Sequence, residues 1–406
     1  MRLFLASVAV LFAGVGHAQH VGRVGPTVPA SSKMHECNVL NFGAKADNAT
    51  DIGPAIKSAF SNCIVKNPNS RLIIPQGNYL LSSTVLLNGG SNWAFQLDGL
   101  ITVDYSAYVS GVVSGNALVF QRMNEFELYS SNGQGYLYRL RPNQDGRSGW
   151  PRLLRVYLSN NFSVHDIKLV DAPSFHLVVG EATNAEVYRI TIRGGNQGGL
   201  DGVDISGTNY HVHHVEVTNR DECVCVKSPS KQGTIENIRC NQSGGPSIGS
   251  LKDGSVTNAF MLKTYPGGAS PGYVKNVLLR NFTNIDVTYN AYITQYWQNS
   301  YAAGASNVQL SNITFSDWRG SVDNGANRGA VVMTVNGNKV VDRCTSTYGS
   351  GSCIKSLSRN VTPAKYATVS ITATAAPSGW VKPSASWGIP PYDLHKPIPV
   401  PTSTFY

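Results

Sequence analysis

Charge is scarce in this sequence of 406 residues. Charged residues make up 14% of it, against about 25% in typical soluble domains, and only 24 residues are acidic. This scarcity excludes coiled coils, charged helical bundles and disordered charged tails. No run of roughly 18 apolar residues follows the N-terminal stretch, so we expect no membrane-spanning helix and no membrane partner. Apolar residues reach 42%, which is enough for a sizeable core.

Basic residues outnumber the few acidic ones. Lys and Arg number 33, which gives a net charge of +9 and attracts polyanions over long range. Nucleic acid and acidic polysaccharide are the two candidate partners. The basic residues are scattered, without the stripe of Lys or Arg among aromatics that is typical of nucleic-acid binding. We therefore expect an acidic polysaccharide partner and no nucleic acid.

Residues 1–18 have the features of a secretory signal peptide. Arg2 precedes an apolar run, Leu3–Val15, and Gly16-His17-Ala18 places small residues at the two positions that a signal peptidase reads. We expect a secreted, extracellular mature protein that starts at Gln19. The alternative, a buried N-terminal helix, is disfavoured because glycines interrupt the segment.

Secretion permits disulfides, and the chain has seven cysteines. A zinc site is the alternative, but it would need two to four residues between paired cysteines, whereas a single residue separates Cys223 from Cys225. No His-x₃₋₅-His follows either, so we expect no metal. Proximity in sequence, which does not prove connectivity, suggests pairs that leave Cys225 unpaired: Cys37 with Cys63, Cys223 with Cys240, and Cys344 with Cys353. Glycosylation signals of the Asn-x-Ser/Thr type stand at Asn48, Asn161, Asn241, Asn281, Asn312 and Asn360.

The order of local patterns indicates one domain. A short helix is expected near the N-terminus, opened by Asp51 and Pro54, and it would cap the first coil of a stack. After it, short β-branched runs alternate with Gly, Asn and Ser turns. Residues 387–406 are rich in proline, which is typical of an extended tail. The domain is therefore expected over residues 19–386.

Equivalent apolar positions recur through the strand-rich part. Ile167, Ile190, Val215 and Ile238 are separated by 23, 25 and 23 residues, a period that suits one coil of a parallel β-solenoid and is too long for a hairpin. A β-sandwich is the alternative, and it would show turn signals about every 8 to 12 residues. Asn, which tolerates left-handed backbone, recurs near corresponding turns at Asn161, Asn184, Asn209, Asn237, Asn276 and Asn312.

Four of the rare acidic residues fall close together, at Asp201, Asp204, Asp221 and Glu222. Asp201 and Asp221 are 20 residues apart, slightly less than one coil, and adjacent parallel strands lie about 4.7 to 4.9 Å apart. Stacking therefore brings Asp201 against Asp221 and Glu222. Because neighbours on a strand point to opposite faces, the backbone must turn at Asp221-Glu222 for both acids to reach one groove.

Carboxylates held this close do not all ionise freely, so one pKa rises while another stays low. The cluster then supplies both an acid and a base, and glycoside hydrolysis requires both groups. The alternative is that these residues are ordinary turn and surface residues, because Asp-Gly is a common turn signal.

Four motifs carry a family likeness: Gly199-Leu200-Asp201-Gly202-Val203-Asp204, Asp221-Glu222-Cys223, Cys240–Ser250 and Met261-Leu262-Lys263. Together they resemble the polygalacturonase-type glycoside hydrolases of family 28, and among these the fungal rhamnogalacturonan hydrolases. The similarity runs from about Cys37 to the proline-rich end. It implies an all-β fold, a right-handed parallel β-helix, which agrees with the period.

The resemblance also implies roles for single residues. Asp221 matches the general acid, and Asp201 and Glu222 match the pair that activates water. Lys263 matches a substrate-binding lysine that would hold a galacturonate carboxylate through a charge-assisted bond. Tyr296 matches a subsite tyrosine. The alternatives are a solvated strand-end charge for Lys263, and a stack between coils for Tyr296 with its neighbour Trp297.

The chain departs from the family pattern in ways that bear on the substrate. Asp204 and Gly244 are expected at the substrate, but Gly244 stands where polygalacturonases carry a His, and Met261 stands where they carry an Arg. Fewer cationic contacts suit a backbone that alternates rhamnose with galacturonate. Between Ser250 and Lys263 the chain is also about a dozen residues shorter than the resemblance predicts.

We therefore expect a monomeric, cofactor-free, inverting endo-hydrolase of the galacturonate–rhamnose linkage in rhamnogalacturonan. Alternatives within the same family are an exo-acting rhamnosidase or galacturonidase and a polygalacturonase. A pectate lyase would need Ca²⁺, and the sequence has no calcium-loop pattern. A non-catalytic pectin-binding β-helix is the alternative from another class.

Overall fold

The computed structural model describes most of the chain from residue 19 to residue 322 and three short strands beyond it. The described ranges are 19–131, 135–139, 150–194, 198–249, 260–265, 272–287, 291–297, 308–316, 319–322, 331–334, 344–346 and 367–369. The expected signal peptide and proline-rich tail therefore lie outside the described residues. None of the described helices is long and apolar enough to cross a bilayer.

The described elements are almost all strands. Two short α-helices, α1 (Gly53–Ala59) and α2 (Tyr105–Val109), accompany three other helical turns, η1 (Ala30–Ser32), η2 (Val39–Phe42) and η3 (Phe60–Ile64). The strands are β1 (His35–Asn38), β2 (Asp47–Asp51), β3 (Ser70–Ile74), β4 (Asn78–Leu81), β5 (Val85–Asn88), β6 (Ser91–Leu97), β7 (Leu100–Val103), β8 (Asn116–Gln121), β9 (Asn124–Tyr129), β10 (Gly135–Arg139), β11 (Arg152–Tyr157), β12 (Asn160–His165), β13 (Ile167–Val170), β14 (Leu177–Arg193), β15 (Val203–Thr218), β16 (Val224–Asn241), β17 (Ser247–Gly249), β18 (Met261–Lys263), β19 (Gly272–Arg280), β20 (Thr283–Val287), β21 (Ala291–Thr294), β22 (Val308–Ser316), β23 (Arg319–Val322), β24 (Val331–Thr334), β25 (Cys344–Ser346) and β26 (Ala367–Val369).

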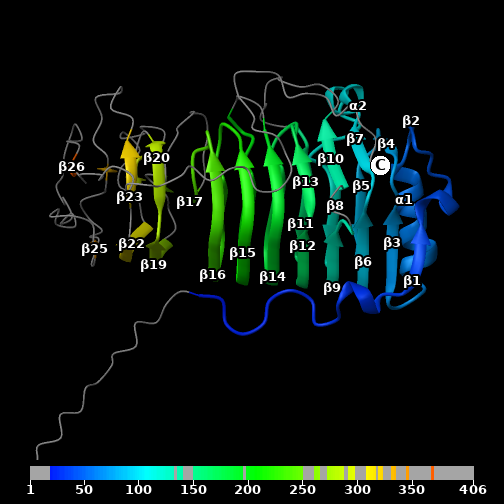
Figure 1. Ribbon diagram of the computed structural model, residues 1–406, viewed down its shortest axis with the longest axis horizontal. Helices are drawn as coiled ribbons and strands as arrows, with labels where there is room; N and C mark the ends of the chain where they lie inside the picture. Colours follow the sequence, from blue (N-terminus) through cyan, green and yellow to red (C-terminus); the bar gives the residue numbers. More distant parts are fainter. Residues whose placement is uncertain are drawn as a thin grey trace, which may run out of the picture.

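The strands wind into stacked coils, and Figure 1 shows neighbouring coils side by side along the long axis. Ile190 pairs in parallel with Val215, and Val215 pairs with Ile238. These are the positions whose spacing predicted the period, so the solenoid prediction is confirmed and the β-sandwich alternative is wrong. Parallel crossovers are right-handed in about 98% of cases, which agrees with the expected hand.

The interior of the stack is a continuous apolar core. Along β14 and β15 the residues that point inward, such as Val187 and Val212, are fully buried and belong to one cluster that extends from Cys37 to Val224. A second, smaller cluster lies between Phe260 and Ile313. Residues that point outward alternate with these buried residues along the same strands. The outward positions can therefore carry polar side chains.

Asparagines form a ladder at one corner of the coils. Asn161, Asn184 and Asn209 all have positive φ angles, between 47° and 58°. The Nδ2 group of Asn184 donates to Asn161 Oδ1 (2.7 Å), and that of Asn209 donates to Asn184 Oδ1 (2.8 Å). The predicted left-handed turns are therefore confirmed here, and they are confirmed at Asn237 and Asn276 as well. The side chain of Asn312 is not among those described.

The first coil is closed by α1, as predicted. Asp51 Oδ1 accepts from the amide of Gly53 (3.0 Å) at the start of the helix and from the amide of Ser82 in the next coil (2.9 Å). Figure 1 shows the helix at the end of the stack.

Residues 19–34, which we call the N-terminal strap, run along the outside of the coils (Figure 1). Bonds fasten the strap to one coil after another. They join the His20 amide to Thr234 Oγ1 (3.0 Å), the Val21 amide to Asn209 Oδ1 (2.6 Å), the Gly25 amide to Asn184 O (2.9 Å) and Lys33 Nζ to Glu127 Oε1 (2.8 Å).

Two of the three expected disulfides are present, Cys37–Cys63 and Cys223–Cys240. Cys225 is free and buried, as expected. The pair Cys344–Cys353 is not tested, because the side chain of Cys344 and the whole of Cys353 lie outside the described part of the chain.

Candidate active site

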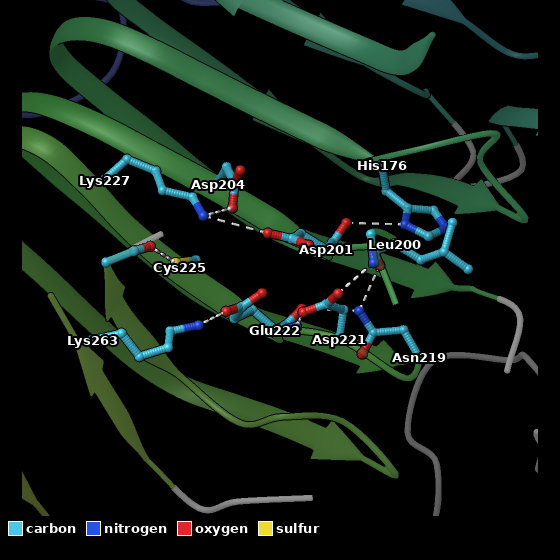
Figure 2. A network of polar contacts seen from close by, with 12 residues as sticks. His176, Leu200, Asp201, Asp204, Asn219, Asp221, Glu222, Cys225, Lys227 and Lys263 are labelled. Carbon is cyan, nitrogen blue, oxygen red and sulfur yellow. Dashed lines mark hydrogen bonds and ion pairs between the residues drawn. The ribbon is translucent and has the colours of Figure 1, made fainter. Parts of the chain in front are cut away.

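The three acids singled out from the sequence converge at one place (Figure 2). Asp201 precedes β15, while Asp221 and Glu222 lie in the connection between β15 and β16. One carboxylate oxygen from each lies within 4.8 Å of the others. All three residues are buried, with 2%, 7% and 0% of their surface exposed. The predicted convergence across stacked coils is confirmed.

A bend in the backbone turns Asp221 and Glu222 toward the same site. Asp221 Oδ1 accepts from the amide of Glu222 (2.9 Å), and Asp221 Oδ2 accepts from the amide of Gly199. The Nδ2 group of Asn219 donates to Leu200 O (2.7 Å) and to Glu222 O (2.9 Å), which ties the segment before β15 to the segment before β16. The bend that strand alternation required is thus built from local side-chain and backbone bonds.

Glycine at position 202 lets the two segments approach. The Gly202 amide donates to Glu222 O at 2.8 Å. A Cβ atom at Gly202 would lie 2.4 Å from Cys223 O and 2.8 Å from Val217 Cγ1. Only glycine fits so close to another backbone. The Asp-Gly pair is therefore more than the turn signal that it resembles in the sequence.

Two lysines contact the carboxylates. Lys263 Nζ donates to Glu222 Oε1, and both side chains are fully buried. Lys227 Nζ lies 3.5 Å from Asp201 Oδ2 and 3.5 Å from Asp204 Oδ1. The Lys227 side chain retains 25% exposure. Each carboxylate other than Asp221 thus has an ammonium group beside it.

The surroundings shift the proton affinities of the cluster. Burial, together with the charge of Asp221, raises the pKa of Asp201 to about 6. Burial raises the pKa of Asp221 to about 6, although the Gly199 amide and both lysines oppose the rise. Burial raises the pKa of Asp204 well above its ordinary value, and Asp201 adds to the rise. Asp201 and Asp221 therefore exchange protons in the weakly acidic range.

Burial lowers the pKa of Lys263 to about 7, although Asp201 and Asp221 oppose the shift. The pKa of Lys227 is instead raised, because the attraction of Asp204 and Asp201 outweighs the burial of its ammonium group. Lys227 is therefore a fixed positive charge beside Asp201.

The geometry of the three oxygens fits one water molecule. A water that donates to two carboxylate oxygens at about 2.7 to 2.8 Å each needs them about 4.5 Å apart. The observed spacing, at most 4.8 Å, is compatible with this requirement. A divalent cation could use the same oxygens, but Lys263 and Lys227 already lie against two of the three carboxylates. The absence of a metal at these acids stays a prediction.

The remaining predicted residues lie around this cluster. Asp204 is buried, points outward from β15 and contacts Lys227. Gly244 is buried, and its amide donates to Asp221 O (2.8 Å), so its observed contact is with the backbone of Asp221. Tyr296 is partly exposed next to Trp297. Substrate binding by these residues stays a prediction.

Four residues of the site escaped the sequence-based assignment of roles. Lys227 is one of them. Trp297 is another, and it belongs to the site because its ring lies 5.0 Å from Lys263 Nζ. His176 is fully buried, and its amide donates to Asp201 O (2.9 Å). The ring of Phe175 lies 5.9 Å from Lys227 Nζ. Their positions relative to the acids depend on which coils stack, and a linear motif does not carry that information.

Cationic and aromatic side chains continue from the acids along the outward face of neighbouring coils. Beyond Phe175, Arg152 lies 5.7 Å from the same ring, and Arg155 lies 4.2 Å from the ring of Tyr157. All four side chains are partly exposed. Tyr157 also donates its hydroxyl to Glu181 Oε1 (2.6 Å). Such a surface, positive and aromatic, suits a sugar chain that carries carboxylates.

Proteins of known sequence resemble this chain over nearly its whole length. The chain is 40% identical to rhamnogalacturonase A of Aspergillus aculeatus, over all of this chain and 96% of that protein. It is 39% identical to a probable rhamnogalacturonase B of Neosartorya fischeri, over 99% of this chain and 83% of that protein. That second alignment spans 444 positions against 406 residues here, so at least 38 positions have no counterpart in this chain.

Solved structures share the fold. The endo-xylogalacturonan hydrolase of Aspergillus tubingensis superposes with a TM-score of 0.66 at 22% identity, over 84% of this chain and 99% of that one. The polygalacturonase of Erwinia carotovora gives 0.57 at 15% identity, over 82% and 96%. Both are right-handed parallel β-helices, which confirms the expected fold class. Residues 66–368 match the model of glycosyl hydrolases family 28. With that match and relatives near 40% identity over nearly its whole length, the chain belongs to glycosyl hydrolases family 28.

Proposed function

We propose that this protein hydrolyses the galacturonate–rhamnose linkage inside rhamnogalacturonan, with inversion at the anomeric carbon. The observation that carries the proposal is the convergence of Asp201, Asp221 and Glu222 within 4.8 Å at a buried site. The names of the two relatives supply the substrate class, and the cationic and aromatic face beside the cluster suits an acidic polysaccharide.

In this mechanism Asp221 is the general acid. Its raised pKa, about 6, keeps it protonated in weakly acidic solution, where it protonates the leaving glycosidic oxygen. The amides of Gly199 and Glu222 hold its two oxygens. Because both bonds are donated by rigid backbone, the carboxyl is oriented before the substrate arrives.

Asp201 and Glu222 act together on the attacking water. Glu222 Oε1 accepts from Lys263, which favours its charged form. Glu222 Oε2 is buried and has no partner among the described residues, so it offers a free acceptor to a water. Lys227 stabilises the charged form of Asp201 in the same way. The two carboxylates would hold the water and remove its proton as it attacks the anomeric carbon.

The contact of Lys263 changes the role that the family likeness implies for it. Its ammonium group is fully buried and bonded to Glu222, so we propose that it positions and charges Glu222. Galacturonate carboxylates would instead meet Arg152 and Arg155, whose side chains are partly exposed. Arg is suited to this task because its planar group can bind a carboxylate through two parallel bonds.

The stereochemical outcome needs its own test. Inverting glycosidases usually hold their two carboxyls about 6.5 to 9.5 Å apart and retaining ones about 5 to 5.5 Å apart, whereas here three nearest oxygens lie within 4.8 Å. We assign inversion because both oxygens of Asp221 are held by amides and two further carboxylates remain to hold a water. NMR of the first products would show the inverted anomer, and the retained anomer would contradict the assignment.

Digestion of purified polysaccharides tests the activity and the substrate. Rhamnogalacturonan should yield oligosaccharides of intermediate size within minutes, and polygalacturonan should yield far fewer reducing ends. Monosaccharide release from the start would indicate exo action, and faster cleavage of polygalacturonan would indicate a polygalacturonase. An unsaturated product that absorbs in the ultraviolet would indicate a lyase. Binding to pectin without any new reducing ends would contradict a hydrolase.

Substitution of the general acid tests the mechanism. We expect Asp221→Asn to lower kcat about 10²- to 10⁴-fold, the range of general acid catalysis. Asn has nearly the same shape and its Oδ1 can still accept one of the two amide bonds, so the variant should fold with a melting temperature only slightly lower. Lys231→Met, on an exposed lysine of β16, is the matched control and should keep full activity. A substitution at Asp221 that left kcat within a few-fold of the wild type would contradict its role.

We also propose that the protein is secreted as a monomer after removal of residues 1–18, and that residues 19–386 form its catalytic domain. The signal-like N-terminus, the two disulfides and the extracellular nature of the proposed substrate support this view. N-terminal sequencing of the secreted protein should start at Gln19, and light scattering should give the mass of one chain.

A further inference from the structure

A second cluster of ionisable side chains lies on another face of the β-helix. Glu186 on β14 pairs with His211 on β15, and His213 follows two positions later. Residues two apart on a strand point to the same side, so all three side chains share one outward surface. The left-handed corner at Asn209 separates this surface from Asp201 and the other catalytic acids.

The three side chains lie close enough to share one ion. One ligand atom from each lies within 4.8 Å of the others. His213 Nε2 lies 3.2 Å from Glu186 Oε1, and the rings of His211 and His213 have centroids 4.1 Å apart. The side chains are partly exposed, by 27% for Glu186, 15% for His211 and 16% for His213. An ion from solution can therefore reach them.

The neighbours of this cluster resemble the supporting groups of metal sites. Glu236 Oε1 lies 3.0 Å from His211 Nε2, and a carboxylate that holds a ligating imidazole is the usual support of a metal-bound histidine. His213 Nδ1 lies 2.8 Å from His214 Nδ1. Each ligand imidazole thus has a partner that fixes its ring.

The N-terminal strap adds an independent observation. His20 stacks on His211 with ring centroids 4.6 Å apart. Its Nδ1 atom is buried and has no hydrogen-bond partner among the described residues. Gly25 of the strap comes so close to Glu186 that a Cβ atom there would lie 2.9 Å from Glu186 Oε2. An unpaired imidazole nitrogen therefore lies beside the cluster, under a segment that covers it.

We propose that Glu186, His211 and His213 bind a transition-metal ion of the Zn²⁺ type at the junction between the coils and the N-terminal strap. Two imidazoles and one carboxylate are a common ligand set for zinc and leave a fourth position for water or for His20. Imidazole nitrogen selects such ions over Mg²⁺ and Ca²⁺, which prefer sites made wholly of oxygen. The ion would join two adjacent coils where the strap begins.

Metal titration of the intact chain, prepared without a polyhistidine tag, tests this proposal. After treatment with a chelator, calorimetry with Zn²⁺ should show one site per chain. Co²⁺ should give the visible absorption of a site with nitrogen and oxygen ligands. His213→Gln and Glu186→Gln should each weaken Zn²⁺ binding at least about tenfold, the scale of losses when metal-site residues are replaced.

Two controls make the test specific. His35→Gln removes an exposed histidine that is far in sequence from the three proposed ligands, and it should leave Zn²⁺ affinity unchanged. Asp221→Asn alters the cluster of Asp201, Asp221 and Glu222 and should also leave Zn²⁺ affinity unchanged. The melting temperature of each variant without metal checks folding, and His211→Gln replaces any variant that misfolds. Absence of binding by the wild type, equal binding by the ligand variants, or loss of binding in Asp221→Asn would overturn the proposal.

Discussion

Asp201 and Asp221 are ordinary aspartates in the sequence, and their neighbours give them their chemistry. Burial raises both pKa values to about 6, while Lys227 opposes the rise at Asp201. A neutral acid and a charged base can then coexist near pH 6. The same two residues in an exposed turn would both be charged there, since an unperturbed aspartate has a pKa of about 3.9.

These values predict a narrow, bell-shaped dependence of kcat/KM on pH, centred near pH 6. Activity falls as pH rises through about 6 because Asp221 loses the proton that it must donate. It falls as pH drops through about 6 because Asp201 gains a proton and no longer accepts one from water. The two limbs report the pair together, because the sites interact.

Lys227→Met should move the acidic limb of this profile to higher pH. Removal of the ammonium group 3.5 Å from Asp201 Oδ2 leaves the charged form of Asp201 less stable, so its pKa rises further. Lys231→Met, which removes an exposed lysine from the same strand, should leave the profile unchanged. A shift of the limb to lower pH would contradict the proposed role of Asp201.

Glycan occupancy is a second prediction for single residues. Asn48 and Asn281 are exposed, and we expect both to be glycosylated in the secreted protein. Asn161 should carry no glycan, because its Nδ2 group donates to Asn124 Oδ1 (3.3 Å) inside the ladder. Mass spectrometry of peptides after enzymatic deglycosylation in heavy-oxygen water would check this. Complete occupancy of Asn161 would show that the ladder bond is not formed.

Among the structural elements, the corners of the coils matter most for the stacking of strands. The ladder of Asn161, Asn184 and Asn209 places an amide side chain at the same corner of successive coils. Each of these amides donates to the Asn of the preceding coil, and those of Asn161 and Asn184 also accept from the Asn of the following coil. The left-handed backbone that this requires is least costly for Asn and Gly. The ladder therefore helps to fix the register of β14 and β15, and the proposed catalytic acids lie directly before and after β15.

Asn184→Ala should lower the free energy of unfolding by about 2 to 4 kcal/mol. Two hydrogen bonds of about 0.5 to 1.5 kcal/mol each are lost, and alanine is disfavoured by about 1 kcal/mol or more at positive φ. Asn237→Ala is the matched control, because its φ is also 54° but it is exposed and takes no part in this ladder. Equal losses in the two variants, measured by denaturant unfolding, would rule out a contribution from the ladder bonds.

At the scale of the whole molecule, the N-terminal strap connects coils that are far apart in sequence. Its anchor is Lys33, which is fully buried and bonded to Glu127 at 2.8 Å. His165 lies 3.6 Å from the other oxygen of Glu127. The strap thus ends on a buried charge cluster to which two adjacent coils also contribute.

Lys33→Met should destabilise the protein by about 3 kcal/mol, the lower end of the cost of breaking a buried ion pair, because His165 still compensates part of the Glu127 charge. The double variant Lys33→Met/Glu127→Gln should recover part of that loss, since it leaves no unpaired carboxylate. Denaturant unfolding of both variants measures the difference. A double variant less stable than Lys33→Met would contradict this account.

The sequence alone determined the coil period, the left-handed asparagines, the capping helix and the identity of the three acids, because each rests on residue spacing or on local backbone preference. Only the tertiary structure decided that Lys263 binds Glu222, that Lys227 lies between Asp201 and Asp204, and that His20 stacks on His211. These contacts join different coils, so they depend on how far each strand extends before its corner. The pKa shifts depend on them in turn, since burial and neighbouring charge exist only once the coils are stacked.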